Sequence, residues 1–229
     1  MTAPISLTVY DELEQGSDEW LAARCGIVTA SVVGQLITPK TVKPASNDYS
    51  RALTAHLAAE RITGYVEPVY VNADMERGTL DEPYARELYS EHYAEATEVG
   101  FMVRDDFGFK IGYSPDGLVG DDGLIEIKSR KQKKHLATIL ADEVPLENMA
   151  QCQTGLLVTG LEWLDYVSYC GGMPLYVKRI LPDPKWQEAI ISAVSTFENN
   201  AAEMIATYKT ATANSPMAER IDHYEEMSI

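Results

Sequence analysis

The alternation of apolar and polar residues is sharpest at residues 124–128, which read Leu-Ile-Glu-Ile-Lys. A period of two is typical of a strand, so Glu126 and Lys128 would share one face and the two isoleucines the other. A Gly-Asp-Asp-Gly turn precedes this strand, and residues 114–117, Ser-Pro-Asp-Gly, form an earlier one. Proline presets φ in such turns and glycine supplies a positive φ. The pattern predicts a hairpin that returns Asp116 to the side of the polar face.

Elsewhere the spacing of apolar residues predicts a mixed α/β fold, with a central mixed sheet flanked by helices. Strands are expected within residues 101–113, 163–170 and 175–180. Residues 1–12 are expected to be a lead-in segment and residues 38–47 a loop. Helices are expected in six stretches: 17–26, from Thr29 or Ser31 to 37, 48–62 with Tyr49, Leu53 and Leu57 on one face, from about 79 to 88, 148–159, and 184 to about 205.

The start of the helix near residue 79 is left open by the sequence. Thr79 and Glu82 have the spacing of a capping box, in which Glu82 would bond to the backbone. A start nearer Asp81 puts Pro83 in the first turn, where its missing N–H costs little, and leaves Glu82 free. In both cases the buried face would consist of Leu80, Tyr84 and Leu88.

Length and composition are those of one globular domain. The chain has 229 residues, of which 45% are hydrophobic and 24% charged, and the expected domain is 1–229 with a polar tail at about 209–229. No apolar stretch is long enough to cross a membrane, so we expect a cytoplasmic protein. The three cysteines are odd in number and form no CxxC pair, which argues against a disulfide framework and against a zinc site.

The net charge of −16 argues against a protein that binds nucleic acid, since such proteins usually carry a basic surface. The sign of the whole chain is not decisive, because affinity depends on the charge of the contact surface. One dense basic run stands out: Lys128, Arg130, Lys131, Lys133, Lys134 and then His135. Such a run is either a solvated helix start or a local lining for phosphates.

Asp116, Glu126 and Lys128 would bring two carboxylates and an ammonium group together. Carboxylate oxygens suit Mg²⁺ or Mn²⁺ better than zinc, and such an ion activates water against a phosphate. The alternative is a solvated hairpin whose acids keep a sheet edge polar. The four histidines have no ligand spacing, and no Gly-rich phosphate loop or nucleophile elbow is present.

Five ordered blocks extend this pattern over residues 13 to 200. With them the sequence resembles the λ-type phage exonucleases, the viral recombinase branch of the PD-(D/E)xK nucleases, which have a restriction-endonuclease-like core. The blocks are residues 15–20 (QGSDEW), 24–31 (RCGIVTAS), 114–117 (SPDG), 126–128 (EIK) and 149–153 (MAQCQ).

The resemblance implies a catalytic site. Asp116, Glu126 and Glu82 would hold Mg²⁺, with Mn²⁺ as an alternative, and the backbone carbonyl of Ile127 would be a further ligand. Lys128 would position the attacking water. Gln151 would support the metal site, although a surface glutamine is the alternative.

The resemblance also implies DNA contacts. Arg24, Ser31 and Ser114 would hold a 5′-phosphate, with Ser31 at a helix N-terminus, where free N–H groups favour an anion. The local alternatives are a surface arginine and a helix cap. Lys40 would contact DNA where the family usually has arginine. Met75 would separate the terminal base pair, unless it is simply buried. Arg130 and Lys131 would belong to the basic lining.

The implied function is Mg²⁺-dependent 5′→3′ degradation of one strand of double-stranded DNA from 5′-phosphorylated ends. The reaction would release mononucleotides and leave a 3′ single strand for recombination. The family further implies a homotrimeric ring, a single-strand annealing protein as partner, and a phage or prophage protein in a bacterial host. A repair or restriction-type endonuclease and a non-catalytic module that binds DNA ends remain alternatives.

Overall fold

The acids lie in a five-stranded mixed sheet. The computed structural model describes residues 5–68 and 70–221. Within them, β9 and β10 run parallel, and the other neighbouring pairs of this sheet are antiparallel. The mixed sheet that the sequence predicts is therefore present. Its strands, in spatial order, are β11 (Tyr176–Ile180), β10 (Trp163–Tyr169), β9 (Gly123–Ser129), β8 (Gly117–Val119) and β5 (Ala96–Thr97).

Helices cover both faces of this sheet. Ala85 and Tyr89 of α3 (Ala73–His92) pack against the face that carries Ile125 and Ile127. The opposite face carries Glu126 and packs against α5 (Leu146–Thr159) and α4 (Gln132–Ala141). The sheet therefore buries isoleucines on one side and presents its polar residues to α5 on the other.

A second sheet, with four strands, lies beyond α5. Its order is β1 (Leu7–Tyr10), β6 (Phe101–Arg104), β7 (Ile111–Tyr113) and β2 (Val28–Thr29). Helix α5 packs against β6 and β7 of this sheet as well as against β9 and β10. It is therefore held between the two sheets, and its Gln151 side chain reaches Glu126 of the first.

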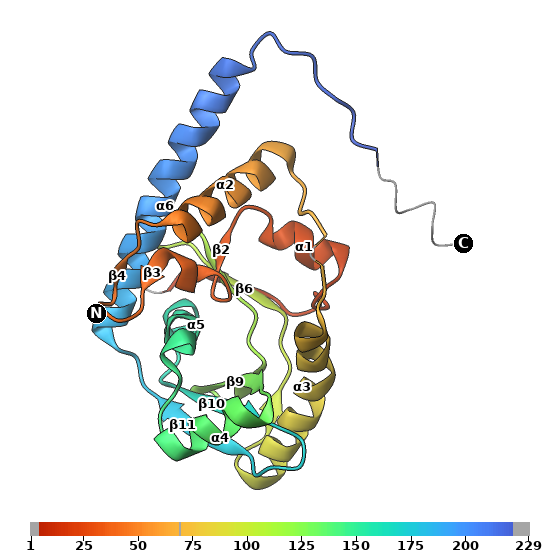
Figure 1. Cartoon of the computed structure of the whole chain (residues 1–229), viewed down its shortest axis with the longest axis vertical. Coiled ribbons are helices and arrows are strands. Elements are labelled where there is room, and N and C mark those ends of the chain that lie inside the picture. Colours follow the sequence, from red (N-terminus) through yellow and green to blue (C-terminus); the bar gives the residue numbers. More distant parts are fainter. Residues whose placement is uncertain (1–4, 69, 222–229) are drawn as a thin grey trace.

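The remaining elements cover the second sheet. Helix α2 (Asp48–Thr63) packs along α6 (Pro184–Ala211), and the far end of α6 projects beyond the body of the molecule (Figure 1). Helix α1 (Asp18–Arg24) lies at the other side of this region, next to the start of α3. A short hairpin of β3 (Ile37–Thr38) and β4 (Lys43–Pro44) contacts α6.

The helix boundaries that depend on caps agree with the sequence. Ser17 accepts a hydrogen bond from the Trp20 N–H and caps α1. Gly64 ends α2 with a positive φ of 65°. Asp183 caps α6, with Pro184 in the first turn, where proline lacks only an N–H that has no partner in the helix.

Four expected elements differ from the structure. The loop expected at 38–47 contains part of the β3–β4 hairpin, in which Thr38 pairs with Lys43. The lead-in segment contains β1, which pairs with β6. The helix expected from 29–31 to 37 is wrong: Val28–Thr29 forms a parallel pair with β7, and only the 3₁₀ turn Val33–Leu36 follows. Helix α3 begins at Ala73, where Asn72 caps it, and runs through Pro83.

The earlier start of α3 changes which residues it buries. Leu80 and Tyr84 are exposed, Leu88 is half-buried, and the buried positions are Ala85 and Tyr89. Of the three residues expected on one face of α2, Leu53 and Leu57 are buried and Tyr49 is exposed. Within residues 5–68 and 70–221, no helix is long and apolar enough to cross a membrane.

Candidate nuclease site

The β8–β9 hairpin puts the two central acids side by side. Gly117 lies opposite Ile125 in its register. Asp116 and Glu126 are the next residues along the two strands, and opposite residues of an antiparallel pair share a face. The Asp116 carboxylate accepts a hydrogen bond from the backbone N–H of Ile127 at 2.6 Å. The hairpin predicted from the sequence therefore forms, with both acids at its end.

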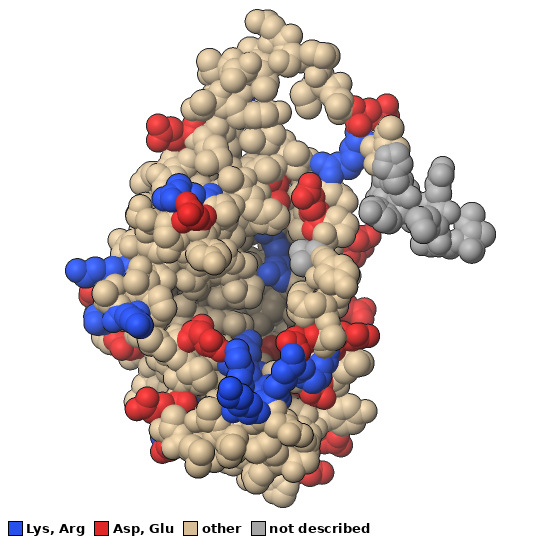
Figure 2. Space-filling model, in the orientation of Figure 1, with Lys and Arg blue, Asp and Glu red and all other residues tan. Residues whose placement is uncertain are grey.

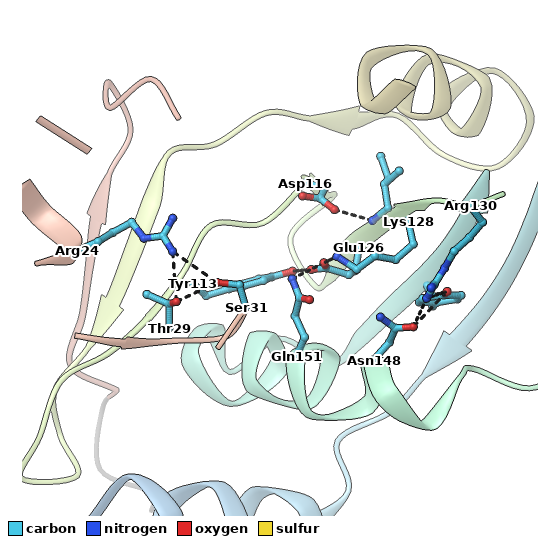
Figure 3. A network of polar contacts seen from close by, with 12 residues as sticks. Arg24, Thr29, Ser31, Tyr113, Asp116, Glu126, Lys128, Arg130, Asn148 and Gln151 are labelled. Atoms are coloured by element: carbon cyan, nitrogen blue, oxygen red, sulfur yellow. Dashed lines mark hydrogen bonds and ion pairs between the residues drawn. The ribbon is translucent and has the colours of Figure 1, made fainter. Parts of the chain in front are cut away.

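Glu126 is fully buried and is the centre of a hydrogen-bond network (Figure 3). Its Oε1 accepts hydrogen bonds from Lys128 Nζ at 2.6 Å and from Gln151 Nε2 at 2.5 Å. Its Oε2 accepts a third from the Tyr113 hydroxyl at 3.0 Å. Strands β7 and β9 and helix α5 thus meet at one carboxylate. Tyr113 was missed by sequence reasoning, because the pattern of its strand does not indicate which residue faces an acid.

The charges of this network determine which groups carry protons. Burial by itself would lower the pKa of Lys128, but the carboxylates of Glu126 and Asp116 raise it above its ordinary value. Lys128 is therefore an ammonium group at neutral pH. Burial, and then the charge of Glu126, raise the pKa of the Tyr113 hydroxyl, so Tyr113 stays protonated and donates.

The charge of Glu126 repels the carboxylates of Asp116 and Glu82. Burial, and then the charge of Glu126, raise the pKa of Asp116 well above its ordinary value, against the opposing charge of Lys128. Burial also raises the pKa of Glu82; Arg86 opposes this rise and Glu126 adds to it. Glu82 therefore lies close enough to sense the other acids, and a bound cation would relieve the repulsion among all three.

The oxygen donors of the site fit a Mg²⁺ ion. Pairing of β8 ends at Gly117, which leaves the Ile127 N–H to Asp116. The N–H and C=O of one strand residue point to the same side, so the Ile127 carbonyl also faces Asp116. Two carboxylates and a carbonyl are the hard ligands that Mg²⁺ prefers. In the described residues, no group of three His, Cys, Asp or Glu side chains is arranged to hold a metal ion, so Glu82 does not complete a ligand set with Asp116 and Glu126 in this structure.

We expect Asp116→Asn to stabilise the metal-free protein at pH 8. The folded state raises the pKa of Asp116, so wild type loses free energy of unfolding as the pH rises above the pKa of the unfolded chain, about 3.9. Asparagine stays neutral and still accepts from Ile127. Each pKa unit of difference is worth about 1.4 kcal/mol, or about 3–6 °C in Tm. Melting in EDTA from pH 3 to 8 measures the gain, which should vanish at pH 3.

Asp142→Asn is the matched control for this variant. Asp142 pairs with Lys178 at 3.0 Å, and that contact lowers the pKa of Asp142. The same change of carboxylate to amide should therefore bring no gain at pH 8. If Asp116→Asn melted at or below the wild-type temperature at pH 8, the repulsion among the acids would be refuted.

A second polar cluster lies next to the acids. Arg24 donates to Thr29 Oγ1 at 3.3 Å and to Ser31 Oγ at 3.4 Å, and its guanidinium stacks 3.7 Å from the centre of the Trp20 ring. Trp20 Nε1 in turn donates to Ser114 Oγ at 3.1 Å. The three residues expected to bind a phosphate are therefore joined through Trp20 and Thr29, neither of which the sequence singled out for this role.

The charge of Arg24 lacks a direct partner. In the described part of the chain, no carboxylate lies within 4.0 Å of its guanidinium. Burial lowers the pKa of Arg24 to about 10, against the opposing charge of Glu60. A desolvated cation beside two hydroxyl groups favours an anion. The helix-dipole argument for Ser31 is wrong, because only a 3₁₀ turn follows it.

A cleft of about 1080 Å³ reaches from the cluster around Arg24 to Glu82, and its lining residues do not include Asp116, Glu126 or Lys128. Its wall contains Arg24, Ser31 and Ser114 at one side and Met75 and Glu82 of α3 at another. Figure 2 shows a hollow in the centre of this face, with Lys and Arg side chains grouped along its lower edge. Met75 is 45% exposed, which excludes the alternative of a buried methionine.

The basic residues expected to contact DNA have different surroundings. Arg130 is mostly buried, and its guanidinium donates to Glu147, Asn148 and the Tyr166 hydroxyl. Its donors are therefore used within the protein rather than presented to DNA. Lys131 is exposed and pairs with Asp74. Lys40 is exposed in the turn between β3 and β4.

The sheet with acids on two adjacent strands and helices on both faces defines the PD-(D/E)xK class of α/β fold. The chain belongs to the family of YqaJ-like viral recombinase domains, whose model matches residues 19–162. That range includes both polar clusters. None of the curated proteins matches the chain.

Solved structures agree with this membership. The alkaline exonuclease LHK-Exo from Laribacter hongkongensis is 36% identical over 87% of this chain and 100% of its own, with a TM-score of 0.77. The structure of LHK-Exo in complex with dAMP has a TM-score of 0.76, with the same identity and the same coverage of both chains. A phage-related exonuclease from Haemophilus somnus 129PT is 15% identical over 80% and 96%, with a TM-score of 0.63, and shares the fold. The resemblance to λ-type phage exonucleases is thus confirmed.

Proposed function

We propose that this protein is a Mg²⁺-dependent 5′→3′ exonuclease. It degrades one strand of double-stranded DNA from 5′-phosphorylated ends, releases mononucleotides and leaves a 3′ single strand for recombination. The family membership and the exonuclease relatives support the nuclease activity. The polarity and the duplex substrate are proposed on the resemblance to the λ-type phage exonucleases, and the metal on that resemblance and the oxygen donors of the site.

The observation that carries this proposal is the connection between the two polar clusters. Ser114 Oγ accepts a hydrogen bond from Trp20 Nε1 in the second polar cluster, which also contains Arg24. It lies two residues before Asp116, whose carboxylate belongs to the acid site. A terminal phosphate held by Arg24 and Ser114 would therefore fix the distance from the DNA end to the acids. Such fixed positioning favours an exonuclease over an endonuclease, which has no use for a pocket at the end of a strand.

The metal would be held by Asp116, Glu126, the Ile127 carbonyl and Glu82. When bound, Mg²⁺ lowers the pKa of its water and neutralises charge that develops on the phosphate. Lys128 is a cation held by Glu126, so it would orient water or phosphate as a hydrogen-bond donor and would not take a proton. Gln151 and Tyr113 hold the Glu126 carboxylate in one orientation.

The proposal is tested on two substrates, a linear and a closed circular duplex. With Mg²⁺, we expect rapid degradation of a linear duplex with 5′-phosphates, no cleavage of a closed circular duplex, and mononucleotides as the product. EDTA should stop the reaction. Nicking of the circle would favour the repair or restriction-type endonuclease. Binding of the linear duplex without any cleavage would favour the non-catalytic module.

The proposal also includes two associations that rest on the family resemblance alone. We expect a homotrimeric ring, which sedimentation velocity would detect, and a single-strand annealing protein as partner. The wedge role of Met75 and the DNA contacts of Lys40 and Lys131 belong to the same proposal.

A further inference from the structure

One arginine at the edge of the cleft connects two of the three acids. Arg86 lies on α3, and its side chain is only 12% exposed. Its Nε donates to the backbone carbonyl of Asp116 at 2.7 Å. Its Nη2 donates to Glu82 Oε1 at 2.5 Å, and its Nη1 donates to Glu98, which follows β5. A single guanidinium thus joins α3, the turn before β8 and the segment after β5.

The bond to the Asp116 carbonyl anchors the main chain of the metal site. The Asp116 side chain is fixed from one side by the Ile127 N–H. Arg86 fixes the backbone of the same residue from the other side, across 30 residues of sequence. Asp116 stands at the end of a short strand, where pairing with β9 has stopped. The arginine therefore supplies a constraint that the sheet does not.

The bond to Glu82 has a second effect. Glu82 is one helical turn from Arg86 on α3, and their pairing limits the rotamers of a flexible carboxylate. The charge of Glu126 reaches Glu82, so this orientation keeps Glu82 near the other acids. Lysine has one donor group at the end of a flexible chain and could not bond to three acceptors in fixed directions.

We propose that Arg86 is a positioning residue that holds Glu82 and Asp116 in the arrangement that binds the metal. The inference rests on the proposed function, because it assumes that these acids are ligands. Residues that orient metal ligands typically contribute a factor of about 10 to 100 in metal affinity or activity. We therefore expect that loss of the Arg86 guanidinium lowers the affinity for the metal and leaves the affinity for DNA unchanged.

The experiment compares wild type with Arg86→Lys by thermal melting, with Mg²⁺ as the only added ligand and no DNA. A metal that binds only the folded state stabilises it by RT ln(1 + c/Kd) at a Mg²⁺ concentration c, so the rise of Tm over a Mg²⁺ titration gives the affinity. We expect the variant to need about tenfold more Mg²⁺ for the same rise. The Mg²⁺ concentration that half-activates cleavage should increase by a similar factor. Affinity for a 5′-phosphorylated duplex in EDTA should stay within about twofold.

Arg77→Lys is the matched control. Arg77 is on the same helix and bonds in fixed directions to Ser129 at 3.0 Å and Asp74 at 2.7 Å, and in the described residues it has no hydrogen bond to Asp116, Glu126 or Glu82. The Arg77→Lys variant should leave the Mg²⁺ midpoint, the concentration that half-activates cleavage, unchanged. Glu98→Gln is a second test, since Glu98 is 73% exposed and its loss should not affect folding. It removes one charged partner of Arg86 and should shift the midpoint in the same direction by a smaller factor.

Two results would overturn the inference while leaving the proposed function in place. One is a wild-type Mg²⁺ midpoint in both Arg86→Lys and Glu98→Gln. The other is an equal shift in Arg77→Lys, which would mean that any loosening of α3 has this effect. If wild type itself showed neither a Mg²⁺-induced rise in Tm nor cleavage, the metal site would be refuted, and the role of Arg86 with it.

Discussion

Replacing Glu126 by glutamine should lower the rate of DNA cleavage by about a thousandfold or more. Such a loss corresponds to about 4 kcal/mol of transition-state stabilisation, which is in the range that a metal ion provides. Glutamine keeps an oxygen that accepts from Lys128 and Gln151, and Tyr113 can accept from its amide. The change therefore removes the charge of the ligand and keeps the packing.

Single-turnover cleavage of a 5′-phosphorylated duplex, with saturating enzyme, measures this loss. Thermal melting confirms that the variant folds, and binding of the duplex in EDTA should be retained. Asp142→Asn is the control, because it removes an ion-paired carboxylate on α4's C-terminal side and should cleave as wild type does. Cleavage by Glu126→Gln within about tenfold of wild type would contradict the assignment of Glu126 as a metal ligand.

The second large effect is expected at the DNA end. Wild type should degrade a duplex with 5′-phosphates about a hundredfold faster than one with 5′-hydroxyl groups, because a misplacement of about 1 Å at the reacting bond has a cost of this order. Arg24→Ala should lose most of this preference. Arg24 is a desolvated cation without a carboxylate within 4.0 Å in the described residues, so its replacement should not lower Tm.

Initial rates on the two duplexes, for wild type and variant, measure the preference. Arg51→Ala is the control, since Arg51 is an exposed arginine paired with Asp48 on α2. Trp20→Phe keeps an aromatic ring under Arg24 but loses the hydrogen bond to Ser114, and should lose part of the preference. Equal wild-type rates on both duplexes would refute the phosphate pocket and favour an endonuclease.

The sequence by itself determined the central hairpin and the helix ends that depend on local caps. Asp116 and Glu126 meet because Pro115 and the glycines around them encode tight turns, and because strand side chains alternate. Ser17 and Asp183 begin helices through bonds to residues two or three positions away. These features depend on neighbours in the chain, so the local pattern contains the information that forms them.

Local patterns failed where tertiary packing outweighed them. Pro83 suggested a helix start, since proline inside a helix costs about 3 kcal/mol. Helix α3 nevertheless runs from Ala73 through Pro83, and the packing of Ala85 and Tyr89 against the sheet offsets that cost. The apolar residues from Val32 to Ile37 have helical spacing, yet only the 3₁₀ turn Val33–Leu36 forms there. Val28 and Thr29, just before them, pair with β7.

Only the tertiary structure decided which polar groups meet at the site. Trp20 reaches Ser114 across 94 residues, and Arg86 reaches the Asp116 carbonyl across 30. Arg130 lies in a basic run but is buried against Asn148, whereas Tyr113 lies in an apolar strand but faces Glu126. The partner of a buried donor depends on how helices and sheets pack, and the residues next to that donor in the sequence do not specify this packing.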